Sequence, residues 1–119
     1  MQITHLFAGV AVTDFESARP WYERLFGRPP DTLPQEGEAV WQLTADAFVY
    51  ITADPERAGS GLLTIAVGDL DAHASTLAER GVTVDQVVAN PGAIRRLIIR
   101  DADGNAITLF EDPAHASSE

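Results

Sequence analysis

The sequence predicts an α+β domain built from two similar halves, because one strand-then-helix opening occurs twice. Residues 7–15 (FAGVAVTDF) match residues 62–70 (LLTIAVGDL), 55 positions further on, with identical Ala, Val and Asp residues and matching apolar positions. In each copy an apolar run typical of a strand leads into apolar residues at helical spacing. The second copy ends in a turn and a strand at residues 101–111 (DADGNAITLFE). A duplicated half-domain is therefore expected.

The first half is expected to hold a strand, a helix and a hairpin. The opening strand is rich in apolar and β-branched residues, which predicts burial on both of its faces. The helix ends at Gly27 and contains Pro20, which removes one backbone hydrogen bond and should kink the axis or shift the first turn. The expected elements are a strand at 3–12, a helix from Thr13 or Asp14 to about Phe26, at most a short edge strand within 32–37, and a hairpin of 39–43 and 47–52.

The second half repeats this order. Its helix begins near Asp69, the counterpart of Asp14, and is stopped by Gly81. The turn at 101–105 joins the last two strands. The expected elements are a strand at 62–67, a helix at about 69–80, a strand at 82–88 and a hairpin of 94–100 and 106–111.

The two halves are expected to form a single domain, since 119 residues with 45% hydrophobic side chains suffice for one compact core. Residues 54–61, with one proline and two glycines, join the halves and carry no recognisable catalytic motif. The expected boundaries over residues 1–119 are module one at about 3–53, the linker at 54–61, module two at about 62–112 and a polar tail at 113–119.

Composition excludes several classes of site. The chain has no cysteine, so it has no disulfide, no thiolate nucleophile and no thiolate metal site. No apolar run reaches the ~20 residues needed to span a bilayer, and the first residues lack the basic and apolar segments of a secretory signal. We therefore expect a cytoplasmic protein without a membrane partner.

The net charge of −10 repels phosphate backbones and anionic membrane surfaces, which argues against nucleic-acid partners. The same charge attracts cationic ligands. The alternative interpretation is that the acidic surface only keeps the protein soluble.

The most diagnostic segment is residues 100–105 (RDADGN). Together with the repeat it resembles the vicinal oxygen chelate superfamily, which includes glyoxalase I, bleomycin-resistance proteins, fosfomycin-resistance enzymes and extradiol dioxygenases; Ala102 replaces the proline of the family's usual Asp-Pro-Asp-Gly-Asn turn. The resemblance covers about Ile3 to Asp112 and implies two βαβββ modules that form a cup-shaped mixed sheet with helices on the outside. It also implies a homodimer, with the cup built within one chain or from module one of one chain and module two of another.

The resemblance further identifies four positions that hold metal ligands in metal-dependent relatives. One lies seven residues before the Asp that caps each helix, and one lies on the last strand of each module. In this chain these positions hold Phe7, Leu62, Tyr50 and Thr108. Because divalent metals in this fold need imidazole or carboxylate donors, no metal and no other cofactor is expected. This argues against isomerase, dioxygenase and metal-assisted transferase activity.

Two further polar residues lie close to these positions. His5 is two residues before Phe7 and shares its strand face, so it could supply a polar contact or one metal ligand, or be a hydrogen-bonded residue at a strand end. Glu111 is out of phase with Thr108 and is expected at a solvated strand end on the opposite face.

The expected ligand-binding surface follows from strand pairing. Pairing the first hairpin through its turn puts Trp41 beside Tyr50, on the face of Phe48, and pairing the second directs Arg96 to the same face. The residues expected to line the cup are Phe7, Trp41, Phe48, Tyr50, Leu62, Arg96, Ile98, Thr108 and Phe110. Arg96 supplies the main charge of the cup. Because a buried guanidinium without a partner is costly, we expect it to pair with a protein carboxylate, to reach solvent at the rim or to contact an anionic or carbonyl group of a ligand.

The preferred hypothesis is a metal-independent small-molecule-binding protein that sequesters an antibiotic or a metabolite, similar to the bleomycin-resistance branch. An aromatic cup and an acidic surface suit a cationic or aromatic ligand, and sequestration needs no catalytic residue. One alternative is an enzyme of the same fold, a lyase, isomerase or dioxygenase with a non-standard site. Another is a non-catalytic interaction module in which the cup residues fill a core.

Overall fold

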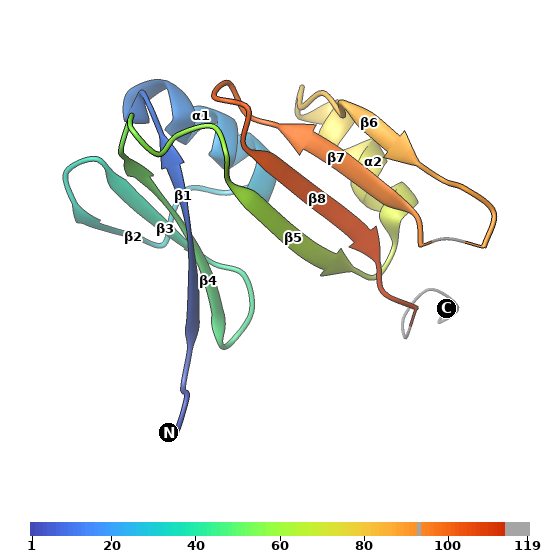
Figure 1. The fold of residues 1–119 in the computed structure, drawn as a ribbon, viewed down its shortest axis with the longest axis horizontal. Helices are drawn as coiled ribbons and strands as arrows, with labels where there is room; N and C mark the ends of the chain where they lie inside the picture. The colour runs from blue at the N-terminus through green and yellow to red at the C-terminus, as the bar shows by residue number, and fades with distance from the viewer. Residues whose placement is uncertain (93, 114–119) are drawn as a thin grey trace.

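The computed structural model describes residues 1–92 and 94–113 and contains two modules of four strands and one helix each (Figure 1). Module one comprises β1 (Leu6–Val12), α1 (Phe15–Phe26), β2 (Thr32–Gln35), β3 (Glu38–Gln42) and β4 (Ala47–Ala53). Module two comprises β5 (Leu62–Val67), α2 (Leu70–Glu79), β6 (Gln86–Val88), β7 (Arg96–Arg100) and β8 (Ala106–Glu111). The predicted α+β fold of two βαβββ modules is confirmed. Of the predicted tail at 113–119, residues 114–119 lie outside the described residues.

Each module forms one mixed sheet. Sheet 1 has the strand order β1-β4-β3-β2 and sheet 2 the order β5-β8-β7-β6. In both sheets the first strand of the module runs parallel to the last one, and the remaining pairs are antiparallel. No helix among the described residues is long and apolar enough to cross a membrane.

The two helices begin in the same way. The side chain of Asp14 accepts a hydrogen bond from the amide of Ser17, and the side chain of Asp69, 55 positions later, accepts one from the amide of Ala72. These caps satisfy backbone donors that an α-helix leaves unpaired at its start. Helix α1 continues through Pro20 without displacement of its first turn and ends at Gly27, whose φ of 82° favours glycine.

Two predictions about strands are wrong. The first strand begins at Leu6 rather than Ile3, and it is buried on one face only: Val10 and Val12 are in the core, whereas Phe7 and Gly9, on the other face, are exposed. The strand predicted at 82–88 is reduced to β6, because Val82 instead packs in the core below the end of α2.

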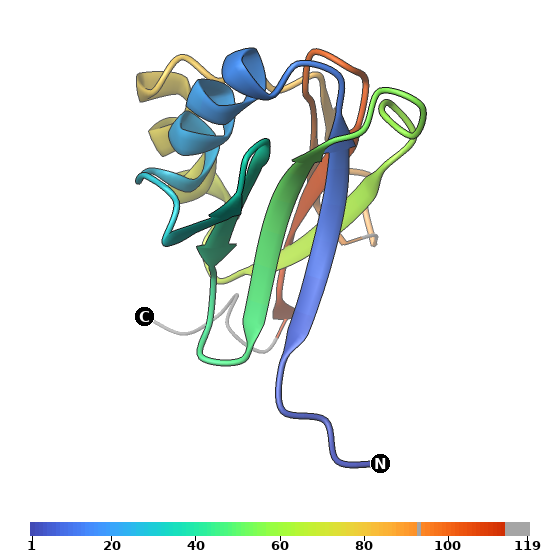
Figure 2. The ribbon, with the colours of Figure 1, turned by 90° about the vertical axis from the view of Figure 1, so that its left-hand side faces the viewer.

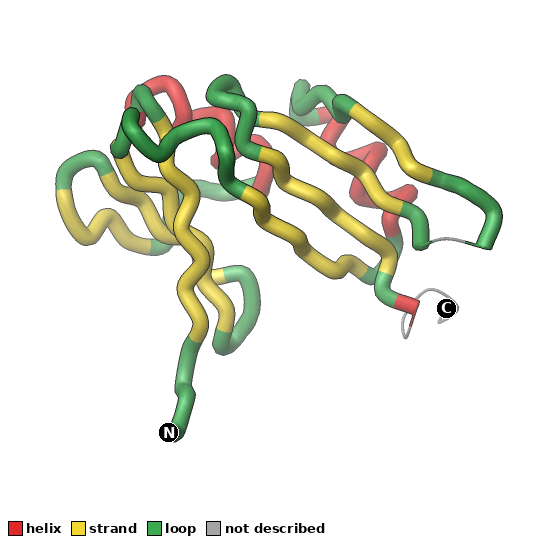
Figure 3. Tube along the Cα trace, viewed as in Figure 1, coloured by secondary structure: helices red, strands yellow, loops and turns green. Residues whose placement is uncertain are grey.

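Both helices lie on one side of the sheets, in the angle between them (Figures 1 and 2). Sheet 2 faces the viewer in Figure 1 with α2 behind it, and sheet 1 is turned toward the viewer in Figure 2. The sheets approach each other along β1 and β5 (Figure 3). Their helix sides share one apolar core. The opposite sides, which we call the helix-free faces, therefore point in different directions and do not face each other.

The side chain of Asn105 fastens the modules together. Its Oδ1 accepts hydrogen bonds from the amides of Gly59 and Gly61 in the linker, at 3.1 and 2.7 Å. Its Nδ2 donates to the carbonyl of Ala11 on β1 and to the carboxylate of Asp101, both at 2.8 Å. A buried amide with all of these partners fixes the turn between β7 and β8 against module one.

Candidate functional site

The helix-free face of sheet 1 carries a cluster of aromatic rings. Phe7 pairs with Phe48 across β1 and β4, and their rings stack with centroids 4.5 Å apart and planes inclined by 14°. The ring of His5 meets Phe48 edge-on at 5.6 Å, and its Nδ1 lies 3.1 Å from the hydroxyl of Thr4. These three rings form one aromatic patch on the helix-free face of sheet 1.

Tyr50 extends this surface along β4. It pairs with Gly9 on β1, and its ring lies across that glycine so closely that a Cβ atom at position 9 would overlap it. Gly9 therefore provides the space in which the Tyr50 ring can lie flat on the sheet. Val40, on the other side of Tyr50 in β3, completes this part of the face.

Trp41 is not part of this face, which corrects its predicted place in the cup. The amide of Leu43 donates to the carbonyl of Ala47, so that Trp41 pairs with Val49 rather than Tyr50. A shift of one residue sends every side chain of a strand to the other side. Trp41 is consequently 0% exposed on the helix side, where its Nε1 donates a 2.9 Å hydrogen bond to the carbonyl of Arg28.

The helix-free face of sheet 2 follows the predicted pairing of the second hairpin. Arg96 pairs with Phe110, and Ile98 pairs with Thr108. Leu62, on the neighbouring edge strand, is 87% exposed. The guanidinium of Arg96 is exposed and forms no hydrogen bond or ion pair with any residue that the structure describes.

One residue of this face was missed by the sequence analysis. Thr64 pairs with Thr108 across β5 and β8 and is exposed, so two hydroxyl groups lie side by side near Leu62. The sequence could have predicted this position, because side chains two residues apart in a strand lie on the same face and Thr64 follows Leu62 at that spacing.

The four positions that correspond to metal ligands in the family all lie on the helix-free faces. They hold Phe7, Tyr50, Leu62 and Thr108. A phenyl ring, an alkyl chain, a phenol and a hydroxyl do not fit a divalent metal ion. Within residues 1–92 and 94–113, no group of three or more His, Asp or Glu side chains is placed to hold a metal.

Glu111 points to the opposite side of sheet 2, as its phase predicts, but it is not the solvated strand end that was expected. Its carboxylate accepts a 3.1 Å hydrogen bond from the amide of Leu70 at the start of α2. It also forms a 3.0 Å ion pair with Arg95, which in turn binds Asp71 at 3.1 Å. These contacts attach the start of α2 to the end of β8.

The residues predicted to line the cup are divided between two separate faces of one chain. The rings of Phe7, Phe48 and Tyr50 lie on sheet 1, whereas Leu62, Arg96 and Thr108 lie on sheet 2. Since the helix-free faces point in different directions, a single chain does not bring the two groups of residues around one ligand (Figure 1). The ligand-binding roles of these residues stay predictions.

Comparison with known proteins gives the following similarities. The model of the Glyoxalase/Bleomycin resistance protein/Dioxygenase superfamily matches residues 2–109. A glyoxalase / bleomycin resistance protein from Catenulispora acidiphila DSM 44928 is similar at 42% identity and a TM-score of 0.89, covering 94% of this chain and 100% of that chain. TnmS3, an antibiotic binding protein from Streptomyces sp. CB03234, is similar at 29% identity and a TM-score of 0.75, covering 93% and 98%.

A bleomycin-binding protein complexed with bleomycin shares the fold at 18% identity and a TM-score of 0.73, covering 91% of this chain and 98% of that chain. A search of the curated proteins found no match.

Proposed function

Because the chain belongs to the Glyoxalase/Bleomycin resistance protein/Dioxygenase superfamily, we propose that it is a metal-independent binding protein that sequesters a small organic molecule, an antibiotic or a metabolite. One observation carries this proposal: the four positions that hold metal ligands in metal-dependent relatives hold Phe7, Tyr50, Leu62 and Thr108 instead. These side chains can contact a ligand but cannot supply a metal with its donors.

The chemistry of the helix-free faces supports a planar ligand. The stacked rings of Phe7 and Phe48 and the flat ring of Tyr50 provide apolar surface for an aromatic system. Arg96 is available to a carbonyl or anionic group of the ligand, and the net charge of −10 attracts ligands that also carry a positive charge. The similarity to TnmS3, an antibiotic binding protein, agrees with this chemistry.

The proposed cup forms between two copies of the chain. Each copy leaves large apolar side chains exposed on its helix-free faces, with Leu62 at 87% and Phe7 at 56% exposure. A homodimer that places sheet 1 of one protomer against sheet 2 of its partner would cover both and create two cups. Each cup would then combine the rings of one protomer with Arg96 of the other.

Binding is tested by thermal shift and isothermal titration of the purified protein with planar and cationic natural products. A ligand at a hundred times its dissociation constant stabilises the folded state by about 2.7 kcal/mol, which gives a readily measured rise in Tm. Phe48→Ala should weaken binding, whereas Ser75→Ala, on the exposed surface of α2, should not. Equal affinity of wild type and Phe48→Ala for every binding compound would contradict a site on this face.

Metal independence is tested separately. The purified protein should contain no stoichiometric Ni, Zn, Mn or Fe by elemental analysis, and ligand affinity should not change after dialysis against a chelator. A tightly held metal at one equivalent per chain would instead favour an enzyme with a non-standard site.

A further inference from the structure

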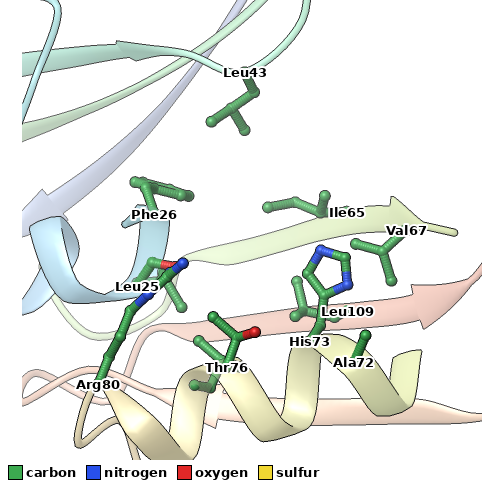
Figure 4. A pocket seen from close by; sticks show the side chains of 11 residues that line it. Leu25, Phe26, Leu43, Ile65, Val67, Ala72, His73, Thr76, Arg80 and Leu109 are labelled. Carbon is green, nitrogen blue, oxygen red and sulfur yellow. The ribbon is translucent and has the colours of Figure 1, made fainter. Parts of the chain in front are cut away.

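The angle between the two sheets contains a cavity of about 330 Å³ on the helix side, away from the proposed cup (Figure 4). Its walls come from both modules. The lining residues are Leu25 and Phe26 of α1, Leu43 after β3, Ile65 and Val67 of β5, Leu109 of β8, and Ala72, His73, Thr76, Leu77 and Arg80 on or next to α2. A volume of this size lies at the lower end of the range for small-molecule sites and suits a single-ring compound.

Most of the lining is apolar, and the polar groups all come from one stripe of the second helix. His73, Thr76 and Arg80 are spaced by three and four residues and therefore share one side of the helix. Figure 4 shows them along one wall, with Phe26 and Leu43 across the space and Ile65 beside it. The cavity thus has an apolar side and a side that can form hydrogen bonds.

Two of these polar groups are available to a ligand. Nδ1 of His73 lies 2.8 Å from the carbonyl of Asp69, which only accepts, so Nδ1 carries the proton and Nε2 remains without a partner among the described residues. The hydroxyl of Thr76 likewise has no partner within residues 1–92 and 94–113. No buried side-chain polar atom of the described residues lacks a hydrogen bond, so both groups are reached by solvent through the cavity.

Arg80 gives the cavity its charge. Its Nη1 donates 3.2 Å hydrogen bonds to the carbonyls of Arg24 and Leu25, which fixes the guanidinium at the end of α1. Of the eleven lining side chains it alone carries a permanent charge, and none is acidic. In a protein with a net charge of −10 this cavity is therefore a local site for a negatively charged group.

We propose that this cavity is a second binding site, separate from the cup, for a small aromatic carboxylic acid. The ring would occupy the apolar side against Phe26, Leu43 and Ile65. The carboxylate would lie on the side of the second helix, where Thr76 and Arg80 can donate hydrogen bonds to it.

Benzoate is the probe for this site. Titration of the ¹⁵N-labelled full-length chain should give saturable amide shifts at residues 73–80 and 65–67, with a dissociation constant on the order of 1 mM. The amides of β1 and β4 should not shift. Benzylamine, which presents a cation on the same ring, should bind at least about fivefold more weakly because it meets Arg80.

Two variants locate the binding. Ala72→Phe places a ring in the cavity and should abolish the benzoate shifts, whereas Ser75→Phe, on the exposed side of α2, should leave them unchanged. Phe48→Ala, which alters the cup, should also leave benzoate binding unchanged, so the two sites can fail independently. The absence of saturable shifts at residues 73–80, or full benzoate binding by Ala72→Phe, would overturn the proposal.

Discussion

The hydroxyl of Tyr22 donates a 2.7 Å hydrogen bond to the carboxylate of Asp101, which lies 79 positions further along the chain. Tyr22 belongs to α1 in module one, and Asp101 begins the turn between β7 and β8 in module two. Both side chains are buried, at 0% and 8% exposure. Burial, followed by the hydrogen bond to Asp101, raises the pKa of Tyr22 well above its ordinary value.

Tyr22→Phe should lower the free energy of unfolding by about 1–3 kcal/mol, because it removes a buried hydrogen bond to a charged acceptor. Asp101 keeps its bonds from the amides of Asp103 and Asn105, so the turn should survive. Urea unfolding followed by circular dichroism measures the change. Tyr50→Phe is the control, since Tyr50 lies on an open face, and it should stay within about 0.5 kcal/mol of wild type.

The same pair predicts a dependence of stability on alkaline pH. The pKa of Tyr22 is raised in the folded state, so above pH ~10 the unfolded chain loses this proton while the folded chain retains it. The stabilisation is therefore complete below pH ~10 and falls as the pH rises further. Unfolding free energies from pH 8 to 11 should decline more steeply for wild type than for Tyr22→Phe, and parallel curves would contradict the expectation.

Asn105→Ala should destabilise the protein by about 3 kcal/mol or more. The change removes four hydrogen bonds at once and leaves the amides of Gly59 and Gly61 without their acceptor. In the variant, hydrogen exchange at the amides of Gly59 and Gly61 should be accelerated relative to wild type more than exchange at the amides of the two sheets. Unchanged protection at Gly61 would show that Asn105 does not hold the linker.

Trp41→Phe should separate stability from binding. The substitution leaves the carbonyl of Arg28 without its donor and opens space in the core, for a loss of about 2 kcal/mol. Because Trp41 lies on the helix side, its substitution should leave affinity for a cup ligand unchanged, whereas Phe48→Ala should reduce it. A loss of affinity in Trp41→Phe at temperatures well below its Tm would contradict this assignment.

Leu62→Arg should shift the proposed homodimer toward monomer, with at least about tenfold weaker self-association. The side chain is 87% exposed on the helix-free face, so the fold of the single chain should tolerate the charge. Analytical ultracentrifugation over a range of concentrations gives the dissociation constant. Val87→Arg is the matched control, since Val87 is 65% exposed but on the other side of sheet 2; equal effects of the two changes would count against the proposed interface.

Several elements of this fold could be predicted because their signals are local. Asp14 and Asp69 cap the helices with their own side chains, three residues from the amides that they bind. The second hairpin was paired correctly because its turn is short and rich in turn-forming residues, which sets the register of the strands beside it.

The errors and omissions have physical causes. The turn between β3 and β4 is compatible with more than one strand register. The predicted register differs by one residue from the observed one, in which Trp41 pairs with Val49 and lies in the core rather than in the cup. The partners of Asn105 and Glu111 lie far away in the sequence, so no local pattern identifies them. The cavity of the second helix was missed for the same reason, since its walls come from both modules.

During protein synthesis, Asn105 is made long after the groups in module one and the linker to which it binds. The carbonyl of Ala11 has its hydrogen bond from Asn105 only after a further 94 residues have been made, and the amides of Gly59 and Gly61 depend on the same side chain. Contacts between residues far apart in the sequence form slowly, and a partly synthesised domain exposes apolar surface until these contacts have formed. We therefore expect the first module to be most open to chaperones, proteases and aggregation before Asn105 has been synthesised.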